Sequence, residues 1–171
     1  MAVRAMSQAR AHEREVRELL ARVPDPEIPV LNIVDLGIVR EVRQEPDGRI
    51  RVAITPTYSG CPATDAIRAM VRAALDAGGY PDAILEEVLS PPWTSDWLTP
   101  AGREKLRAFG IAPPEDSVAS VRQLIGSPAA VTCPRCGSHA TERVSEFGST
   151  PCKAHYRCRA CGEPFDYFKC I

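Results

Sequence analysis

Apolar side chains recur every three to four positions in two long segments of the chain. Residues 7–22 and residues 62–78 each place their apolar positions on one face, which predicts two amphipathic helices. A third, shorter helix is predicted at residues 100–109, because Thr99 and Pro100 are good starting residues and Gly110 is a good end.

Three other segments have the alternation of apolar and polar positions that is typical of strands. These segments are residues 38–44, 49–55 and 83–89. Pro46-Asp47-Gly48 lies between the first two and predicts a hairpin turn. The order α-β-β-α-β then predicts an α+β sandwich, in which the last strand returns to the sheet after a right-handed crossover.

The cysteines are distributed unevenly, and this unevenness suggests where the chain divides. Cys61 is isolated, whereas the other six cysteines all lie in the last part of the sequence. We expect a first domain at residues 1–112, a linker at residues 113–130 that contains one short helix, and a small β domain of the zinc-ribbon type at residues 131–171. A domain of about 110 residues is long enough to bury a core of its own.

Composition excludes several classes of protein. The chain has 171 residues, of which 44% are hydrophobic and 25% charged, and its formal net charge is −1. Such a balance is ordinary for a globular protein and gives no overall attraction to nucleic acid. No apolar run approaches the roughly 18 residues that would span a membrane, and the start of the chain lacks the apolar core of a signal peptide. We therefore expect a cytoplasmic protein with neither nucleic acid nor membrane as its partner.

Four cysteines have the spacing of a metal site. Each of two Cys-x-x-Cys-Gly motifs places two thiolates around a tight turn, and two such knuckles supply four ligands. A segment of about 40 residues buries too little surface to fold unaided, so bound metal would stabilise it. Zinc is favoured, although four thiolates also suit iron or an iron–sulfur cluster. The expected ligands are Cys133, Cys136, Cys158 and Cys161.

Three further residues of this segment are additional candidates. Cys152, His155 and Cys170 are either part of a small core or members of a redox pair or second metal site that receives metal in transit.

Cys61 stands in a setting that favours a reactive thiol. It lies between a predicted strand and a predicted helix, and Pro62 suits the first helical position, so Cys61 is the expected N-cap. Unpaired amides and the helix dipole stabilise a thiolate at such a position. Asp25 and Asp35 lie in an earlier loop and are candidate neighbours, the alternative being that each is a turn or cap residue.

Two sets of motifs resemble known families. Asp25-Pro-Glu-Ile-Pro29, Ile33-Val-Asp-Leu-Gly37 and Thr55-Pro-Thr-Tyr-Ser-Gly-Cys-Pro62 resemble the SufT-like family, which is associated with the maturation of iron–sulfur proteins. Ser90-Pro-Pro-Trp-Thr-Ser-Asp-Trp97, together with the cysteine-rich segment, resembles the PaaD family, the accessory subunits encoded with the phenylacetyl-CoA epoxidase.

The resemblance implies an accessory protein of aerobic phenylacetate degradation rather than a catalyst. Its partners would be the iron–sulfur reductase or the di-iron oxygenase of the epoxidase, and a homodimer is implied by the resemblance alone. The leading hypothesis is that Cys61, with Asp25 or Asp35, guides iron or a cluster into one of these components. A structural scaffold of the oxygenase complex is the second hypothesis, and a thiol-dependent enzyme that uses Cys61 is the third.

Overall fold

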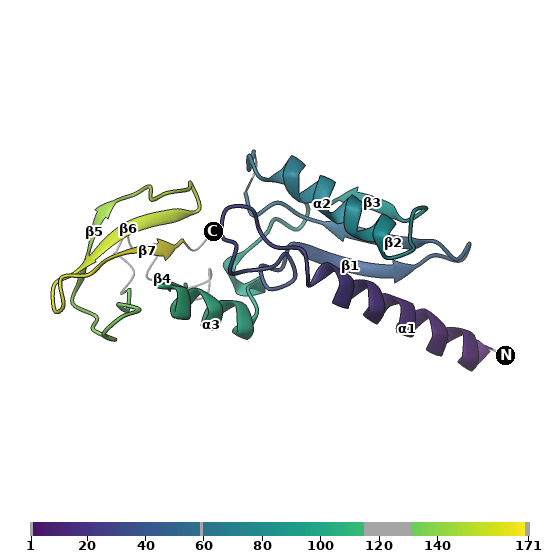
Figure 1. Cartoon of the computed structure of the whole chain (residues 1–171), viewed down its shortest axis with the longest axis horizontal. Helices are drawn as coiled ribbons and strands as arrows, with labels where there is room; N and C mark the ends of the chain where they lie inside the picture. The colour runs from purple at the N-terminus through teal and green to yellow at the C-terminus, as the bar shows by residue number, and fades with distance from the viewer. Residues whose placement is uncertain (1, 59, 115–130, 170–171) are drawn as a thin grey trace. The chain divides into compact units, whose positions relative to one another are not determined.

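The computed structural model describes residues 2–58, 60–114 and 131–169. It divides the chain into two compact units, Met1–Trp93 and Thr94–Ile171 (Figure 1). Each unit has its own sheet and its own core. They are therefore described separately.

The N-terminal unit is built from two helices and three strands. Their order is α1 (Ala2–Leu20), β1 (Val39–Gln44), β2 (Ile50–Ile54), α2 (Thr64–Ala77) and β3 (Ile84–Glu87). The sheet order is β1-β2-β3, with β1 antiparallel and β3 parallel to β2. The predicted α-β-β-α-β order and the return of the last strand to the sheet are confirmed.

The core of this unit lies between the helices and the sheet. Val16 and Leu20 of α1, Val71 and Leu75 of α2, and Val52 of β2 are all inaccessible to solvent. These positions are spaced three to four apart on the helices, as the periodicity predicted. Burial of such side chains stabilises the fold by about 1.5–3 kcal/mol each.

The two ends of β1 differ in their contacts. The strand pairing of β1 with β2 is irregular between Val39 and Glu41, where one extra residue forms a bulge. At the other end of β1, the Glu13 carboxylate of α1 accepts a hydrogen bond of 3.2 Å from the backbone N–H of Gln44.

The C-terminal unit begins with helical segments and continues as a four-stranded sheet. The sheet order is β4-β7-β6-β5, with β5, β6 and β7 antiparallel in succession and β4 parallel to β7. The elements are η1 (Ser95–Trp97), α3 (Pro100–Phe109), β4 (Ile111–Ala112), β5 (Thr141–Ser145), β6 (Lys153–Cys158) and β7 (Pro164–Phe168).

The helix α3 has the ends that the sequence predicted. The Thr99 side chain accepts a hydrogen bond from the N–H of Gly102, and Gly110 ends the helix with a φ of 90°. Directly after it, Ile111 and Ala112 pair with Asp166 and Tyr167 of β7.

By packing, therefore, α3 and β4 group with the cysteine-rich strands rather than with the N-terminal unit. The domain boundaries expected from the sequence, 1–112 and 131–171, remain a prediction. The linker helix expected within 113–130 falls mostly on residues 115–130, outside the described residues.

The ribbon core is small and aromatic. The Tyr156 ring stacks on Phe165 and meets Tyr167 edge to face, with ring centroids 5.9 and 5.5 Å apart. The buried residues of this cluster are Ala112, Val131, Cys133, Ala154, Tyr156, Cys158, Phe165 and Tyr167. The α+β class with a ribbon-like C-terminal sheet is confirmed.

Candidate metal centre and reactive cysteine

The four knuckle cysteines meet at one point of the C-terminal unit. Their sulfur atoms all lie within 4.8 Å of one another. Cys133 Sγ is 3.8 Å from Cys161 Sγ, and Cys136 Sγ is 3.6 Å from Cys158 Sγ, so each short distance joins one knuckle to the other. Cys133 and Cys158 are buried, whereas Cys136 and Cys161 are exposed.

The two knuckles have the same backbone geometry. The N–H of Gly137 donates to the carbonyl of Cys133, and that of Gly162 donates to the carbonyl of Cys158, each at 2.9 Å. Both glycines have a positive φ, 73° and 79°, in the left-handed region that favours glycine. The glycine that follows each Cys-x-x-Cys is thus required by the turn.

These distances fit a tetrahedral metal ion. A Zn–S bond of about 2.3 Å places the sulfurs of a regular tetrahedron about 3.8 Å apart, close to both inter-knuckle distances. Four thiolates form a typical ligand set for structural zinc. The cluster therefore fits metal binding, with the second cysteine of each knuckle at the solvent side.

The surroundings of the sulfurs shift the pKa of two of the four knuckle cysteines. The backbone N–H of Cys161, opposed by desolvation, lowers the pKa of Cys158 to about 7. The Ser138 amide acts to lower the pKa of Cys136, but contact with the Cys161 thiol and desolvation outweigh it, and that pKa rises to about 12. Four thiolates at this separation repel one another, and a divalent cation offsets that repulsion.

Cys61 lies in a turn before α2 and is half-buried. The prediction that it caps the helix is wrong, because the N-cap residue is Ala63. The reason is an extra turn: the N–H of Thr64 donates to the carbonyl of Cys61 at 3.1 Å, and the helix starts only afterwards. Gly60, with a φ of 82°, allows the chain to reverse just before the thiol.

Asp25 is a buried turn residue. Its Oδ1 accepts hydrogen bonds from the N–H groups of Glu27 and Ile28, at 2.9 and 2.6 Å. Its own N–H donates to the carbonyl of Leu31. The carboxylate thus holds the loop that follows α1.

Asp35 is buried in the next turn. Its Oδ2 accepts a hydrogen bond of 2.8 Å from the side-chain amide of Asn32. The Asn32 Oδ1 in turn accepts from the N–H groups of Val34 and Asp35, at 3.0 and 2.8 Å. Both acidic candidates therefore have the turn role that the sequence analysis kept as an alternative.

The strand connections bring these loops to one end of the N-terminal sheet. β1 begins where β2 ends, as the hydrogen bond from Thr55 N–H to the Ile38 carbonyl shows. β3 ends beside them, since Val88 N–H donates to the Ile54 carbonyl. Within the described residues, however, only the four knuckle cysteines form a group that could hold a metal ion, and Cys61, Asp25 and Asp35 do not.

Trp93 packs at the end of the N-terminal unit where β1 begins and β2 ends. Its side chain is buried and its indole N–H donates a hydrogen bond of 2.8 Å to the carbonyl of Leu36. This contact crosses 57 residues of sequence. Trp93 therefore packs over the core of its own unit.

Among the described residues, the additional candidates of the C-terminal unit do not belong to the four-cysteine group. Cys152 is buried, and its Sγ lies 3.0 Å from the hydroxyl of Thr150. His155 Nδ1 lies 3.5 Å from Asp166 Oδ1. Cys170 falls outside the described residues.

Sequence reasoning missed an ion pair in this region. The buried Lys153 contacts Asp166 with 3.3 Å between Nζ and Oδ2. The sequence around Lys153 does not indicate that the lysine is buried. The ion pair becomes evident only when the pairing of β6 with β7 is known, because Lys153 lies on one strand and Asp166 on the other.

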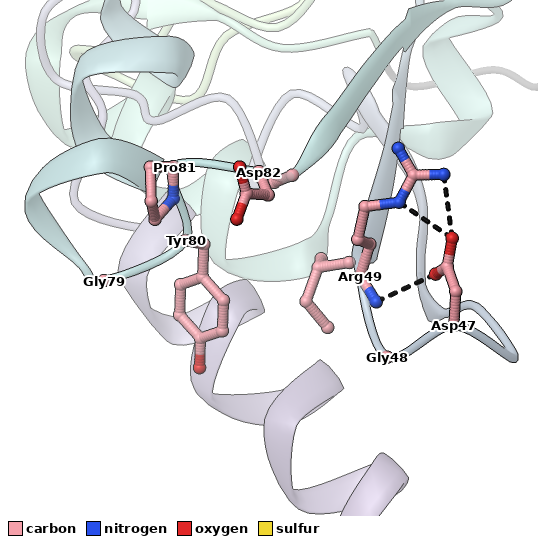
Figure 2. A pocket seen from close by; sticks show the side chains of 9 residues that line it. Asp47, Gly48, Arg49, Gly79, Tyr80, Pro81 and Asp82 are labelled. Atoms are coloured by element: carbon pink, nitrogen blue, oxygen red, sulfur yellow. Dashed lines mark hydrogen bonds and ion pairs between the residues drawn. The ribbon is translucent and has the colours of Figure 1, made fainter.

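A hollow of about 330 Å³ lies at the opposite end of the N-terminal sheet, where β2 and β3 begin (Figure 2). Asp47 accepts two hydrogen bonds from Arg49 across the hairpin turn, which lowers the pKa of Asp47. Burial, and then a hydrogen bond with Glu15, raise the pKa of Tyr80, which lines the hollow. None of the predicted site residues lines it.

The described helices include none that is both long and apolar enough to cross a lipid bilayer.

Two family models match the chain. Residues 13–81 match an iron–sulfur cluster assembly protein family, and residues 117–169 match the PaaD zinc beta ribbon domain. The first covers α2 and the Cys61 turn, and the second contains all four knuckle cysteines.

Curated relatives and a solved structure agree with these matches. The chain is 50% identical over 157 residues to an Escherichia coli protein that is named as a subunit of the 1,2-phenylacetyl-CoA epoxidase, covering 92% of each. It is 37% identical over 90 residues to the Bacillus subtilis "Fe-S protein maturation auxiliary factor YitW", covering 52% of this chain and 87% of that protein. A domain of unknown function, DUF59, from Bacillus anthracis superposes with a TM-score of 0.53 at 28% identity, covering 60% and 96%.

The relative in Escherichia coli matches 92% of the chain, and the auxiliary factor matches about half of it. The chain therefore belongs to the PaaD family, with an iron–sulfur assembly domain followed by the PaaD zinc beta ribbon.

Proposed function

We propose that this protein is a non-catalytic accessory factor of a phenylacetyl-CoA epoxidase that assists the assembly of iron or an iron–sulfur cluster in one of the epoxidase components. The observation that carries the proposal is the presence, in one chain, of an iron–sulfur assembly domain and a PaaD ribbon. The first supplies a thiol for the cargo, and the second supplies a surface that recognises the client.

Cys61 is the residue through which the cargo would pass. It is half-buried at the end of the sheet, and Gly60 beside it leaves room for a close approach, since a Cβ at Gly60 would meet nothing within 4 Å. A single thiolate binds iron weakly compared with a complete ligand set, so it would release its cargo to a client with more ligands. Asp25 and Asp35 would act by holding the neighbouring loops, or by joining Cys61 when the client binds.

The ribbon would keep its metal while the cargo moves. We propose zinc as the structural ion at Cys133, Cys136, Cys158 and Cys161, because the inter-sulfur distances fit it. Iron in the same site is the alternative, and elemental analysis of the purified chain distinguishes the two.

The test is the metal content of the client components. The oxygenase and reductase components would be purified from cells that carry wild-type protein, Cys61→Ser, Pro62→Ala or no protein. We expect Cys61→Ser and the deletion to lower iron or acid-labile sulfide in one component severalfold. Pro62→Ala, which alters the same turn but keeps the thiol, should give wild-type occupancy.

Full occupancy in all four strains would rule out a maturation role. Circular dichroism of Cys61→Ser should match that of wild-type protein, because residue 61 is part of no described core. A variant that fails this check would be replaced by Cys61→Ala before the metal contents are compared.

A structural scaffold is the second candidate, favoured because the Escherichia coli relative is named as part of the epoxidase itself. A scaffold would remain at constant stoichiometry in the active epoxidase. A maturation factor would be absent from the mature complex.

A further inference from the structure

The loop between β5 and β6, residues 146–152, folds over one face of the ribbon sheet. Side chains of β6 alternate between two faces: Ala154, Tyr156 and Cys158 enter the core, and Lys153, His155 and Arg157 point to the other face. Lys153 is nevertheless only 5% exposed. The loop is what covers it.

The loop lies very close to the strands. A Cβ at Gly148 would be 2.9 Å from Asp166 Oδ1 and 3.3 Å from Lys153 Cβ, so only glycine fits without displacement. The Gly148 N–H donates to the Lys153 carbonyl at 2.7 Å, and the Ser149 hydroxyl donates to Asp166 Oδ2 at 3.0 Å. Backbone and side-chain contacts therefore fix the loop on both β6 and β7.

This rigid loop presents Phe147 to solvent. The ring is 63% exposed, although the residue is held by its N–H, which donates to Ser145 Oγ at 3.2 Å. The Lys169 ammonium lies 4.5 Å from the ring centroid and also donates to the Glu146 carbonyl at 3.2 Å. An exposed aromatic ring that is already ordered loses little entropy on binding, which is the property of an interface anchor.

One cationic side chain lies at this ring and another lies further along the same face of the sheet. The Lys169 ammonium contacts the ring, and Arg157 lies on the same face of β6 as Lys153 and His155. His155 faces Asp166, with 3.5 Å between Nδ1 and Oδ1. The carboxylate of Asp166 already contacts Lys153, His155 and Ser149. The carboxylates of Glu146 and Glu142 are paired with Arg143 and Arg159. Arg157 is exposed and has no ion pair within the described part of the chain, so its charge is available to a partner.

We propose that Phe147, Lys169 and Arg157 form the docking surface of the ribbon, and that it fits an apolar pocket rimmed by carboxylates on the client component. This inference rests on the proposed function, because the client is the epoxidase component that receives the cargo. Aromatic anchors with a charged rim are typical of such interfaces, where the rim governs the association rate and its salt dependence.

Direct binding to purified epoxidase components tests the surface, using the full-length chain with its metal. Phe147→Ala should weaken the affinity about tenfold or more, as expected for truncation of an anchor residue. Phe109→Ala is the matched control, because Phe109 is 61% exposed in the same unit and lies outside the surface. It should bind like wild-type protein.

The charges are tested by reversing one of them. Arg157→Glu should lower the association rate severalfold at low salt and flatten its dependence on ionic strength. Arg107→Glu, an exposed arginine of α3, is the control and should change the rate much less. Unaltered metal content and circular dichroism would establish that each variant is folded.

The outcomes distinguish an error in the proposed docking surface from an error in the proposed function. If wild-type protein binds a component and Phe147→Ala binds equally well, the surface is wrong while the proposed function stands. If wild-type protein binds no component, both fail. If Phe147→Ala instead dissociates a homodimer in analytical ultracentrifugation, the surface is a self-association contact and the acidic partner is excluded.

Discussion

At the scale of single residues, the buried acidic side chains Asp25 and Asp35 hold backbone turns. A carboxylate that accepts two backbone N–H groups, as Asp25 does, replaces hydrogen bonds that water would otherwise make. Cys61 differs from them, because it is half-buried and belongs to no described core. Structural and functional roles can therefore be separated by substitution.

Asp25→Ala should lower the free energy of unfolding by about 1–3 kcal/mol, because the buried amide of Ile28 and the half-buried amide of Glu27 lose their acceptor. Asp25→Asn keeps an acceptor oxygen and should be affected less. Urea denaturation measures both. If Asp25→Asn is as stable as wild-type protein but lowers client iron, then the charge itself takes part in transfer.

At the scale of elements, the sequence predicted the helices and strands whose apolar residues recur periodically. It missed a strand that forms only by pairing with a segment distant in sequence. The helices and strands of the N-terminal unit followed from their apolar spacing, and the knuckles from Cys-x-x-Cys-Gly. The two-residue strand Ile111–Ala112 has no period of its own and exists only because β7 pairs with it. The start of α2 was misplaced because Pro62 is equally suited to a turn and to the first helical position.

The cap of α3 gives a test at this scale. Thr99→Ala should destabilise the C-terminal unit by about 1 kcal/mol, because the N–H of Gly102 loses its acceptor. Thr99→Ser retains a hydroxyl and should stay within a few tenths of a kcal/mol of wild-type protein. Equal midpoints of thermal unfolding for all three proteins would contradict the assignment of this cap.

At the scale of the whole molecule, the two units draw their stability from different sources. The N-terminal unit has a conventional apolar core between helices and sheet. The ribbon core is a handful of aromatic and small residues beside four sulfurs. For structural zinc, the binding free energy is of order 10 kcal/mol and is largely folding free energy.

Removal of the metal by a strong chelator should therefore unfold the ribbon and leave the N-terminal unit folded. In two-dimensional NMR spectra, the amide chemical shifts of residues 131–169 should move to values typical of unfolded chains. Those of residues 10–93 should stay unchanged. Cys158→Ser should reproduce the chelated state without chelator. Cys61→Ser should not, and a loss of the N-terminal signals on chelation would refute the separation of the two sources.

The indole of Trp93 has a consequence for how the protein is made. Its hydrogen bond to Leu36 closes the N-terminal unit with the last residue of that unit. During synthesis, domains fold as units in order from the N-terminus. A nascent chain can thus complete its iron–sulfur assembly domain before any knuckle cysteine has left the ribosome. The cysteine-rich segment then emerges when the N-terminal unit of the same chain is already folded.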